Sequence, residues 1–150
     1  MNLLEIKKAI TNEAIKKQEE LYQDLMDEAH VGGEIGEDIP ELETGEAGHE
    51  SESVKMAAIR REEAEEVKQI ISTLKNYRFE TPHEEVEKLA LVVTNRGNFF
   101  ISKAIKPVTV DGTKYYLLAT DAPIYSAMDG KKKGDSFSFN NIDYTIQDLA

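Results

Sequence analysis

Apolar residues recur every three or four positions in two stretches of the chain, residues 2–29 and residues 54–77. This spacing places the apolar side chains along one face of a helix, with charged side chains on the other face. A single narrow apolar stripe suits a seam between two helices better than burial in a globular core. The sequence therefore predicts two long helices that pair antiparallel. The apolar positions are Leu3, Ile6, Ile10, Ala14, Leu21 and Leu25 in the first stretch, and Val54, Ala57, Ala64, Val67, Ile71 and Leu74 in the second.

Antiparallel pairing of these stripes gives a specific register. It sets Leu3 near Tyr77, Ile10 near Ile71, Ala14 near Val67 and Leu25 near Ala57. The seam is expected to be weakest near Lys17 and Arg61, and Lys7 is assigned to the outward charged face. Ser51 or Ser53 is the expected N-cap of the second helix, because a serine hydroxyl can accept a bond from the free N–H groups there.

An acidic segment, residues 31–53, separates the two predicted helices. It contains eight acidic residues, no lysine or arginine, and glycines at positions 32, 33, 36, 45 and 48. Repulsion between the charges and the high ordering entropy of glycine both oppose a long helix or a core. We expect a loop that presents its carboxylates at the far end of the helical hairpin. A solvated connector without a metal role is the alternative reading.

The rest of the chain has the pattern of a small sheet. Thr81-Pro82 ends the second helix, since proline disfavours helix in the residue before it. Strands are predicted in residues 89–94, 99–105, 108–110, 115–119, 137–139 and 142–146. Asp111-Gly112 and Asn140-Asn141 are hairpin turn signals, and residues 123–129 are a short helix that starts with proline and ends at Gly130. The predicted fold class is α+β, an antiparallel two-helix coiled coil followed by a small antiparallel sheet with one short helix.

Charge and composition exclude several classes of function. The net charge of −11 over 150 residues opposes direct binding to a nucleic-acid backbone, and it favours a basic channel or a bound cation as partner. The chain has no cysteine, no signal-peptide pattern and no long apolar run, so we expect a cytoplasmic protein without a membrane span. His30, His49 and His83 are isolated, which argues against zinc. No phosphate loop, nucleophile elbow or Ser/His/Asp arrangement is present, so we expect no enzymatic activity of the chain alone.

Residues 122–135 read APIYSAMDGKKKGD and precede two predicted strands. This segment resembles the C-terminal domain of the Gre (GreA and GreB) transcript-cleavage factors, in which Ser-Pro leads a short helix containing Ala-Leu, followed by Gly-Lys and then Gly-Asp before a final hairpin. The chain departs from that pattern at Ala122, where the family has serine, and at Met128-Asp129, where apolar residues are usual. The helical hairpin with an acidic tip is the other half of the Gre architecture. The resemblance implies a coiled-coil hairpin in residues 1–79 and an FKBP-like domain in residues 83–150.

The resemblance also implies a function. Gre-like factors bind RNA polymerase and insert the coiled coil into its secondary channel. Tip carboxylates there help to hold a second Mg²⁺, which stimulates cleavage of the RNA 3′ end in backtracked complexes. Mg²⁺ binds hard oxygen ligands and keeps several waters, so one or two carboxylates beside polymerase groups suffice. The metal would be shared with the polymerase rather than bound stably by this chain alone, and we expect the factor to be a monomer.

Two sets of tip residues fit the family pattern. Asp38 and Glu41 have the spacing of the acidic pair in the family tip, whereas Glu50 and Glu52 lie at the matching distance from the second helix. We rank Asp38 and Glu41 first. Lys131, Lys132 and Lys133 are either a solvated turn or a contact with the polymerase rim, where the C-terminal domain docks in the family.

Three other functions stay open at this point. The chain could occupy the polymerase channel as a regulator without stimulating cleavage. It could be an FKBP-like peptidyl-prolyl isomerase or chaperone active through residues 80–150, although the absence of tryptophan from the chain speaks against such a pocket. It could also be an adaptor whose acidic hairpin binds another basic protein.

Overall fold

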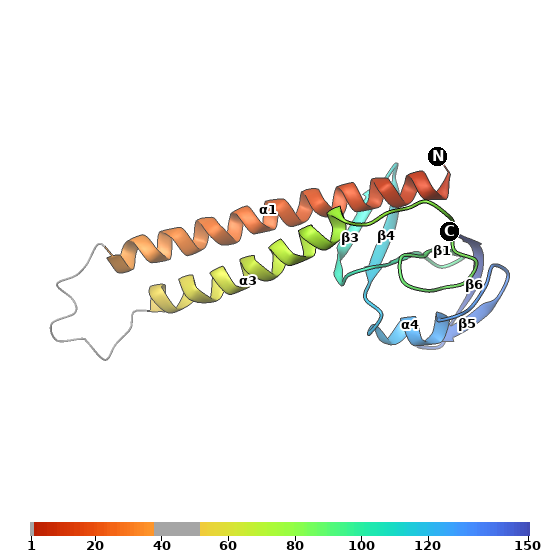
Figure 1. Ribbon diagram of the computed structural model, residues 1–150. Coiled ribbons are helices and arrows are strands. Elements are labelled where there is room, and N and C mark those ends of the chain that lie inside the picture. The colour runs from red at the N-terminus through yellow and green to blue at the C-terminus, as the bar shows by residue number, and fades with distance from the viewer. Residues whose placement is uncertain (1, 38–51) are drawn as a thin grey trace. The chain divides into compact units, whose positions relative to one another are not determined.

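The computed structural model describes residues 2–37 and 52–150, with side chains described for residues 2–30 and 52–150. Two long helices, α1 (Leu3–Glu37) and α3 (Glu52–Lys75), precede six strands and one short helix (Figure 1). The predicted α+β fold class is confirmed. The strands are β1 (Leu91–Thr94), β2 (Asn98–Ile101), β3 (Ile105–Val110), β4 (Thr113–Leu118), β5 (Ser136–Phe139) and β6 (Ile142–Leu149), and the short helix is α4 (Pro123–Met128).

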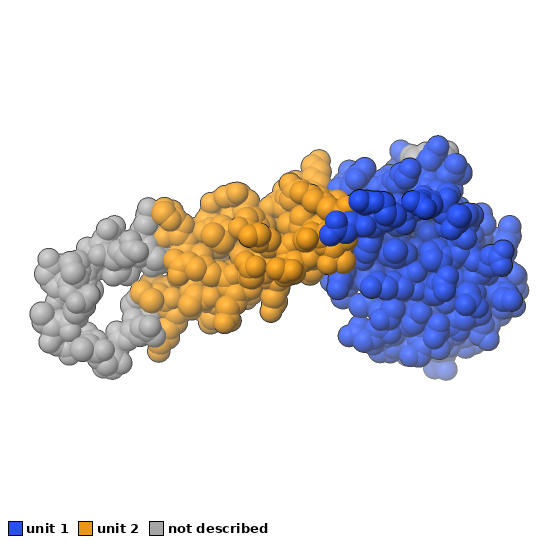
Figure 2. Space-filling model, in the orientation of Figure 1, with its two compact units in different colours: residues 1–14, 76–150 blue, residues 15–75 orange. Residues whose placement is uncertain are grey.

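Contacts divide the chain into two compact units (Figure 2). The sheet unit consists of Met1–Ala14 and Asn76–Ala150, and the hairpin unit consists of Ile15–Lys75. The sequence suggested a division into residues 1–79 and 83–150, whereas the contacts place residues 1–14 with the sheet. Helix α1 is continuous through Ala14 and Ile15, so the chain passes between the units twice, once inside α1 and once after α3.

The six strands form one sheet in the order β3-β4-β2-β1-β6-β5. Every neighbouring pair is antiparallel except β2 and β4, which run parallel, with Phe99 opposite Tyr116 and Ile101 opposite Leu118. The predicted antiparallel sheet therefore contains one parallel pair, which the sequence pattern did not indicate. The hairpin signal at residues 111–112 specifies that β3 and β4 pair with each other, but it does not specify which of them lies beside β2.

Both predicted hairpin turns are confirmed. Asp111 and Gly112 have φ of 49° and 79°, and Asn140 and Asn141 have φ of 51° and 63°. Two consecutive residues with positive φ are the signature of the type I′ turn, whose twist matches that of the flanking strands. These turns fix the registers of β3 with β4 and of β5 with β6.

The sheet is covered on both faces, because successive side chains of a strand point to opposite sides. On one face, Phe99 and Ile101 belong to the main core, together with Met128 of α4 and Ile146 of β6. On the other face, Phe100 is fully buried and its ring meets those of Tyr77 and Phe79 edge-on, at 6.4 and 5.9 Å between centroids. The segment between α3 and β1 therefore forms part of the second core layer.

The helices of the hairpin unit pair antiparallel, as predicted, but in a different register. Glu28 contacts Arg60 at 2.7 Å, and Leu25 shares a buried cluster with Ala64 and Val67. The predicted pairing of Leu25 with Ala57 is thus wrong, because Leu25 packs with residues that lie seven and ten positions further along α3. A narrow stripe of small residues permits several registers, and the long polar side chains decide among them.

The buried face of α1 also differs from the predicted one. Leu21 is 42% exposed, whereas Gln18, Leu25 and Ala29 are buried. The buried positions of α3 follow the prediction, with Ala57, Ala64, Val67 and Leu74 buried. The buried face of α1 therefore includes the polar side chain of Gln18 and leaves out Leu21.

The boundaries of the acidic segment need correction. Helix α1 continues through Glu37 and so includes residues 31–37, which the glycines had assigned to the loop. Each glycine costs about 1 kcal/mol relative to alanine in a helix, but an existing helix gains one hydrogen bond for each residue added. Helix α3 begins at Glu52, so Ser53 lies inside the helix and is not its N-cap, and Ser51 lies outside the described residues.

Candidate functional site

The predicted tip residues are only partly described by the structure. Asp38, Glu41 and Glu50 lie outside the described residues. Glu52 is the first residue of α3 and is exposed. A carboxylate at this position is favourable, because the free N–H groups of a helix N-terminus carry partial positive charge. The acidic segment is thus connected at both ends to helices of the hairpin unit.

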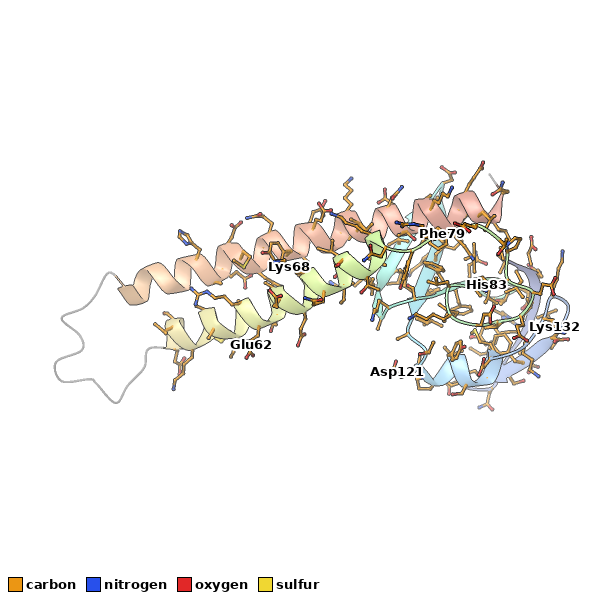
Figure 3. The ribbon with its side chains drawn as sticks, in the orientation of Figure 1. Glu62, Lys68, Phe79, His83, Asp121 and Lys132 are labelled. Atoms are coloured by element: carbon orange, nitrogen blue, oxygen red, sulfur yellow. The ribbon has the colours of Figure 1, made fainter. Side chains whose placement is uncertain are left out.

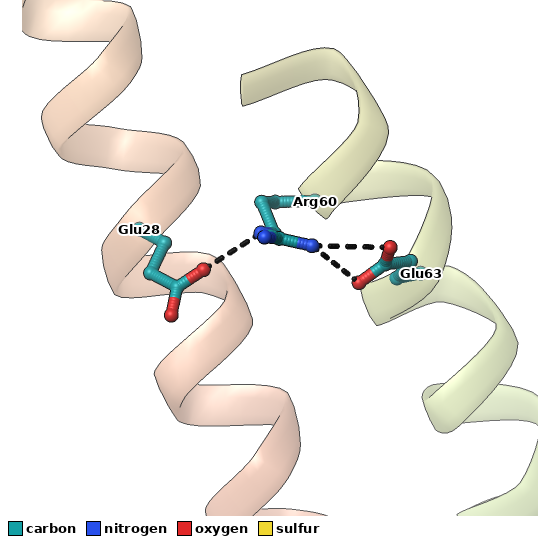
Figure 4. A network of polar contacts seen from close by, with 3 residues as sticks. All are labelled: Glu28, Arg60 and Glu63. Atoms are coloured by element: carbon teal, nitrogen blue, oxygen red, sulfur yellow. Dashed lines mark hydrogen bonds and ion pairs between the residues drawn. The ribbon is translucent and has the colours of Figure 1, made fainter. Parts of the chain in front are cut away.

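Arg60 links the two helices of the hairpin (Figure 4). Its Nε donates to Glu28 Oε2 of α1 at 2.7 Å, and its Nη1 donates to both carboxylate oxygens of Glu63 at 3.0 and 3.1 Å. A planar guanidinium can make several directed hydrogen bonds at once, so Arg60 constrains the orientation of the two glutamate carboxylates as well as their distance from it. Near the other end of the unit, Lys75 Nζ lies 3.6 Å from Glu19 Oε1. These polar contacts close the seam beside the buried cluster of Leu25, Ala64 and Val67.

In the view with side chains (Figure 3), the charged residues Glu62 and Lys68 project from α3. Within residues 2–30 and 52–150, no group of three or more His, Asp or Glu side chains is placed to hold a metal ion. The Mg²⁺ role of the tip carboxylates stays a prediction. No helix in the described ranges is both long enough and apolar enough to cross a membrane.

The segment that resembles the Gre C-terminal domain has well-defined structural roles. Pro123 is the first residue of α4, where the missing N–H of proline costs nothing. Ala122 occupies the N-cap position without a side-chain bond, which is the consequence of alanine standing where the family has serine. Met128 is fully buried in the main core, so it supplies the apolar contact expected there, and Asp129 is exposed and accepts a bond from the Tyr125 hydroxyl at 3.1 Å.

The lysine run is a turn held by its backbone. The Val86 N–H donates to the Lys131 carbonyl at 2.8 Å, and the Lys132 N–H donates to Asp135 Oδ2 at 2.8 Å. Gly130 and Gly134 flank the run with φ of 74° and 93°. Lys132 projects from the turn (Figure 3), and Lys133 Nζ lies 3.7 Å from Asp148 Oδ1. The backbone is thus fixed, while the charged ends of Lys132 and Lys133 are exposed.

Lys7 is a further residue of interest, and the sequence prediction placed it incorrectly. It was assigned to the outward face, but only 1% of Lys7 is exposed. Its ammonium lies 5.5 Å from the centroid of the Phe79 ring, a cation–π contact. The spacing could have revealed this position, because Lys7 lies four residues after Leu3 and three before Ile10, on the same helical face.

Comparisons with known proteins give one distant similarity. No protein-family model matches the chain, and no curated protein matches it. Among solved structures, the chain is similar to GreA factor homolog 1 (Gfh1) of Thermus thermophilus, at 9% sequence identity and a TM-score of 0.34. The comparison covers 92% of this chain and 95% of that one. The relationship is a weak structural likeness, and the function must be argued from the residues of this chain.

Proposed function

We propose that this protein is a Gre-like transcription elongation factor that binds RNA polymerase and stimulates cleavage of backtracked RNA. The observation that carries the proposal is the helical hairpin, whose two helices are joined by residues 38–51, a segment with five acidic residues and no lysine or arginine. Helix α3 has 24 residues and so extends about 36 Å at about 1.5 Å per residue. Such a hairpin has the length and charge needed to carry carboxylates into a deep basic channel.

The resemblance of residues 122–135 to the Gre C-terminal domain supports the same proposal independently. In the structure these residues form the short helix, the two glycine turns and the entry to the final strand pair. Pro123, Gly130 and Gly134 each have a conformational reason for their position. The segment therefore has the same structural use here as in the family pattern.

The proposed chemistry belongs to the polymerase active site, and the factor supplies oxygen ligands. We assign this role first to Asp38 and Glu41, and second to Glu50 and Glu52. Their carboxylates would hold a second Mg²⁺ together with polymerase groups and RNA phosphate. When bound, this metal would lower the pKa of a coordinated water, the nucleophile for hydrolysis of the RNA phosphodiester near the 3′ end, in which the P–O bond to the released 3′ fragment breaks. The chain would have no nuclease activity alone.

A charge-matched pair of variants tests the assignment. The first replaces Asp38, Glu41, Glu50 and Glu52 with alanine. The second replaces four exposed carboxylates on the helices, Glu20, Asp24, Glu62 and Glu66, with alanine. We expect the first variant to lose RNA cleavage while it still binds polymerase, and the second to keep both. Cleavage retained by the first variant contradicts the assignment. If the wild type binds polymerase and blocks the channel but stimulates no cleavage, the protein is a channel-occupying regulator.

The lysine run is proposed as a contact with the polymerase rim. Reversal of Lys131, Lys132 and Lys133 to glutamate should weaken binding to polymerase, because Lys132 and Lys133 present exposed side chains on a turn that backbone hydrogen bonds hold in place. The matched control reverses Lys88, Lys103 and Lys106, which lie elsewhere on the sheet unit. Unchanged binding by the first variant contradicts this contact.

A further inference from the structure

We propose that residues 3–14 of α1 form a releasable clasp on the sheet unit, and that the charge on Lys7 controls how strongly this clasp is held. The clasp is defined as the part of α1 that belongs to the sheet unit. Lys7, Ile10, Thr11 and Ala14 are its buried residues, with between 0 and 5% exposed. A buried ammonium in the middle of this face makes docking depend on protonation.

An aromatic ring lies against the charged end of Lys7. Its ammonium lies over the ring of Phe79, which is labelled in Figure 3, and Phe79 meets Phe100 of β2 and Tyr77 edge-on. Aromatic faces attract a cation, but they replace only part of the hydration that the ammonium loses on burial. The first turns of α1 therefore pack on the sheet unit with a buried ammonium whose lost hydration is only partly replaced.

Among the described residues, the acidic side chain whose charge favours the Lys7 ammonium is Glu87, in the segment before β1. This carboxylate is also bonded to His83 Nδ1, and no ion pair joins it to Lys7 within the described residues. Two further polar groups lie in the same layer. Tyr77 Oη and Ser102 Oγ are buried and close enough to influence each other, but neither makes a well-aligned hydrogen bond within the described residues. On the helix itself, the Thr11 hydroxyl donates to the Lys7 carbonyl at 2.8 Å.

These surroundings set the direction of the pH effect. Burial lowers the pKa of Lys7 from 10.5 to about 8, and the attraction of Glu87 opposes this shift. The released clasp would expose Lys7 to water and restore its ordinary pKa. The released state therefore binds more protons than the docked state between about pH 8 and pH 10.5, so docking strengthens as pH rises through this window.

Release of the clasp would change the connection between the units. The chain crosses between them at residues 14–15 and at residues 75–76. With the clasp docked, both crossings are anchored to the sheet unit, whereas only the second is anchored when the clasp is released. The clasp is thus a device that can loosen the attachment of the hairpin without unfolding the sheet.

Amide hydrogen exchange of the full-length protein tests the clasp. After correction for the intrinsic exchange rates, the opening equilibrium constant of residues 3–14 should fall about tenfold between pH 7 and pH 9, as calculated from the two pKa values. In K7M this pH dependence should disappear, and the clasp should already be strongly protected at pH 7. The control K8M replaces the adjacent exposed lysine and should behave as the wild type.

A second variant covers the outcome in which K7M does not fold. E87Q removes the attractive carboxylate but keeps Lys7, so opening at pH 7 should increase, and the NMR titration of the Lys7 ε-methylene should move to lower pH. Identical pH dependence of exchange in the wild type and K7M, or a Lys7 titration near pH 10.5 that E87Q leaves unchanged, overturns the proposal.

Discussion

Replacement of Lys7 by methionine should stabilise the protein, which is unusual for a substitution at a fully buried position. Methionine is unbranched and close to lysine in length, so it can follow the path of the lysine side chain beside Phe79. It carries no charge and needs no hydrogen-bond partner. The change therefore removes a desolvation cost without creating a large cavity.

The magnitude follows from the pKa of Lys7. A pKa lowered from 10.5 to about 8 means that the charged form is disfavoured by about 3.4 kcal/mol in the folded state relative to the unfolded one. The cation–π contact with Phe79, which methionine cannot make, offsets about 0.5 to 2 kcal/mol of this. We expect K7M to raise the free energy of unfolding at pH 7 by about 1.5 to 3 kcal/mol.

The pH dependence gives a second, independent signature. The unfolded state binds more protons than the folded state between about pH 8 and pH 10.5, so the wild type should gain about 1.4 kcal/mol of stability from pH 7 to pH 9. K7M should lack this gain. The pKa values of Tyr77, Tyr115 and Tyr125 are raised, chiefly by burial, so their effect is a loss of stability above about pH 10, outside the interval from pH 7 to pH 9.

Urea denaturation of wild type, K7M and K8M at both pH values is a suitable assay, with near-ultraviolet circular dichroism of the tyrosines as the probe of the sheet unit. A K7M protein that is less stable than the wild type at pH 7, with K8M unchanged, would refute the reasoning. That result would mean that the buried ammonium is well compensated and contributes to the fold.

Two further predictions concern the core and the hairpin. M128A should lower the free energy of unfolding by about 2 to 5 kcal/mol, because Met128 is fully buried in the main core, and a loss below about 1 kcal/mol in urea denaturation would contradict that packing. A double-mutant cycle of E28A and R60A, followed by helical circular dichroism, should give a coupling of about 0.5 to 1 kcal/mol that falls at high salt, since both side chains are partly exposed. No coupling at low salt would contradict the register of α1 and α3.

Local signals in the sequence predicted much of the fold. The turn pairs at residues 111–112 and 140–141 indicated their hairpins, because few residues accept positive φ. Pro123 and Gly130 marked the two ends of α4. In each case a backbone constraint acts within a few residues, so it can be read without knowledge of the remaining structure.

Features that depend on distant contacts were not predictable in the same way. The parallel pairing of β2 with β4 and the register of Glu28 with Arg60 join segments that approach each other only in the folded protein. The burial of Lys7 was missed for another reason. Its charge assigned it to the polar face of the helix, although its spacing places it on the apolar face. The ring that accepts its ammonium belongs to Phe79, which is distant from Lys7 in the sequence.

The candidate site shows the same limit. Composition alone reveals the acidic segment, but the choice among Asp38, Glu41, Glu50 and Glu52 depends on geometry that composition does not contain. Of these, the structure describes Glu52, at the exposed start of α3. The roles of the others are therefore a matter for the variants proposed above.

The most direct test of the proposed function is RNA cleavage in a stalled, backtracked complex of the cognate RNA polymerase at fixed Mg²⁺. The RNA should be shortened from its 3′ end when the wild-type protein is added, and should stay intact with the variant that lacks all four tip carboxylates. Intact RNA in the presence of saturating wild-type protein would contradict the role in cleavage, and an additional failure to bind the polymerase would contradict the Gre-like assignment itself.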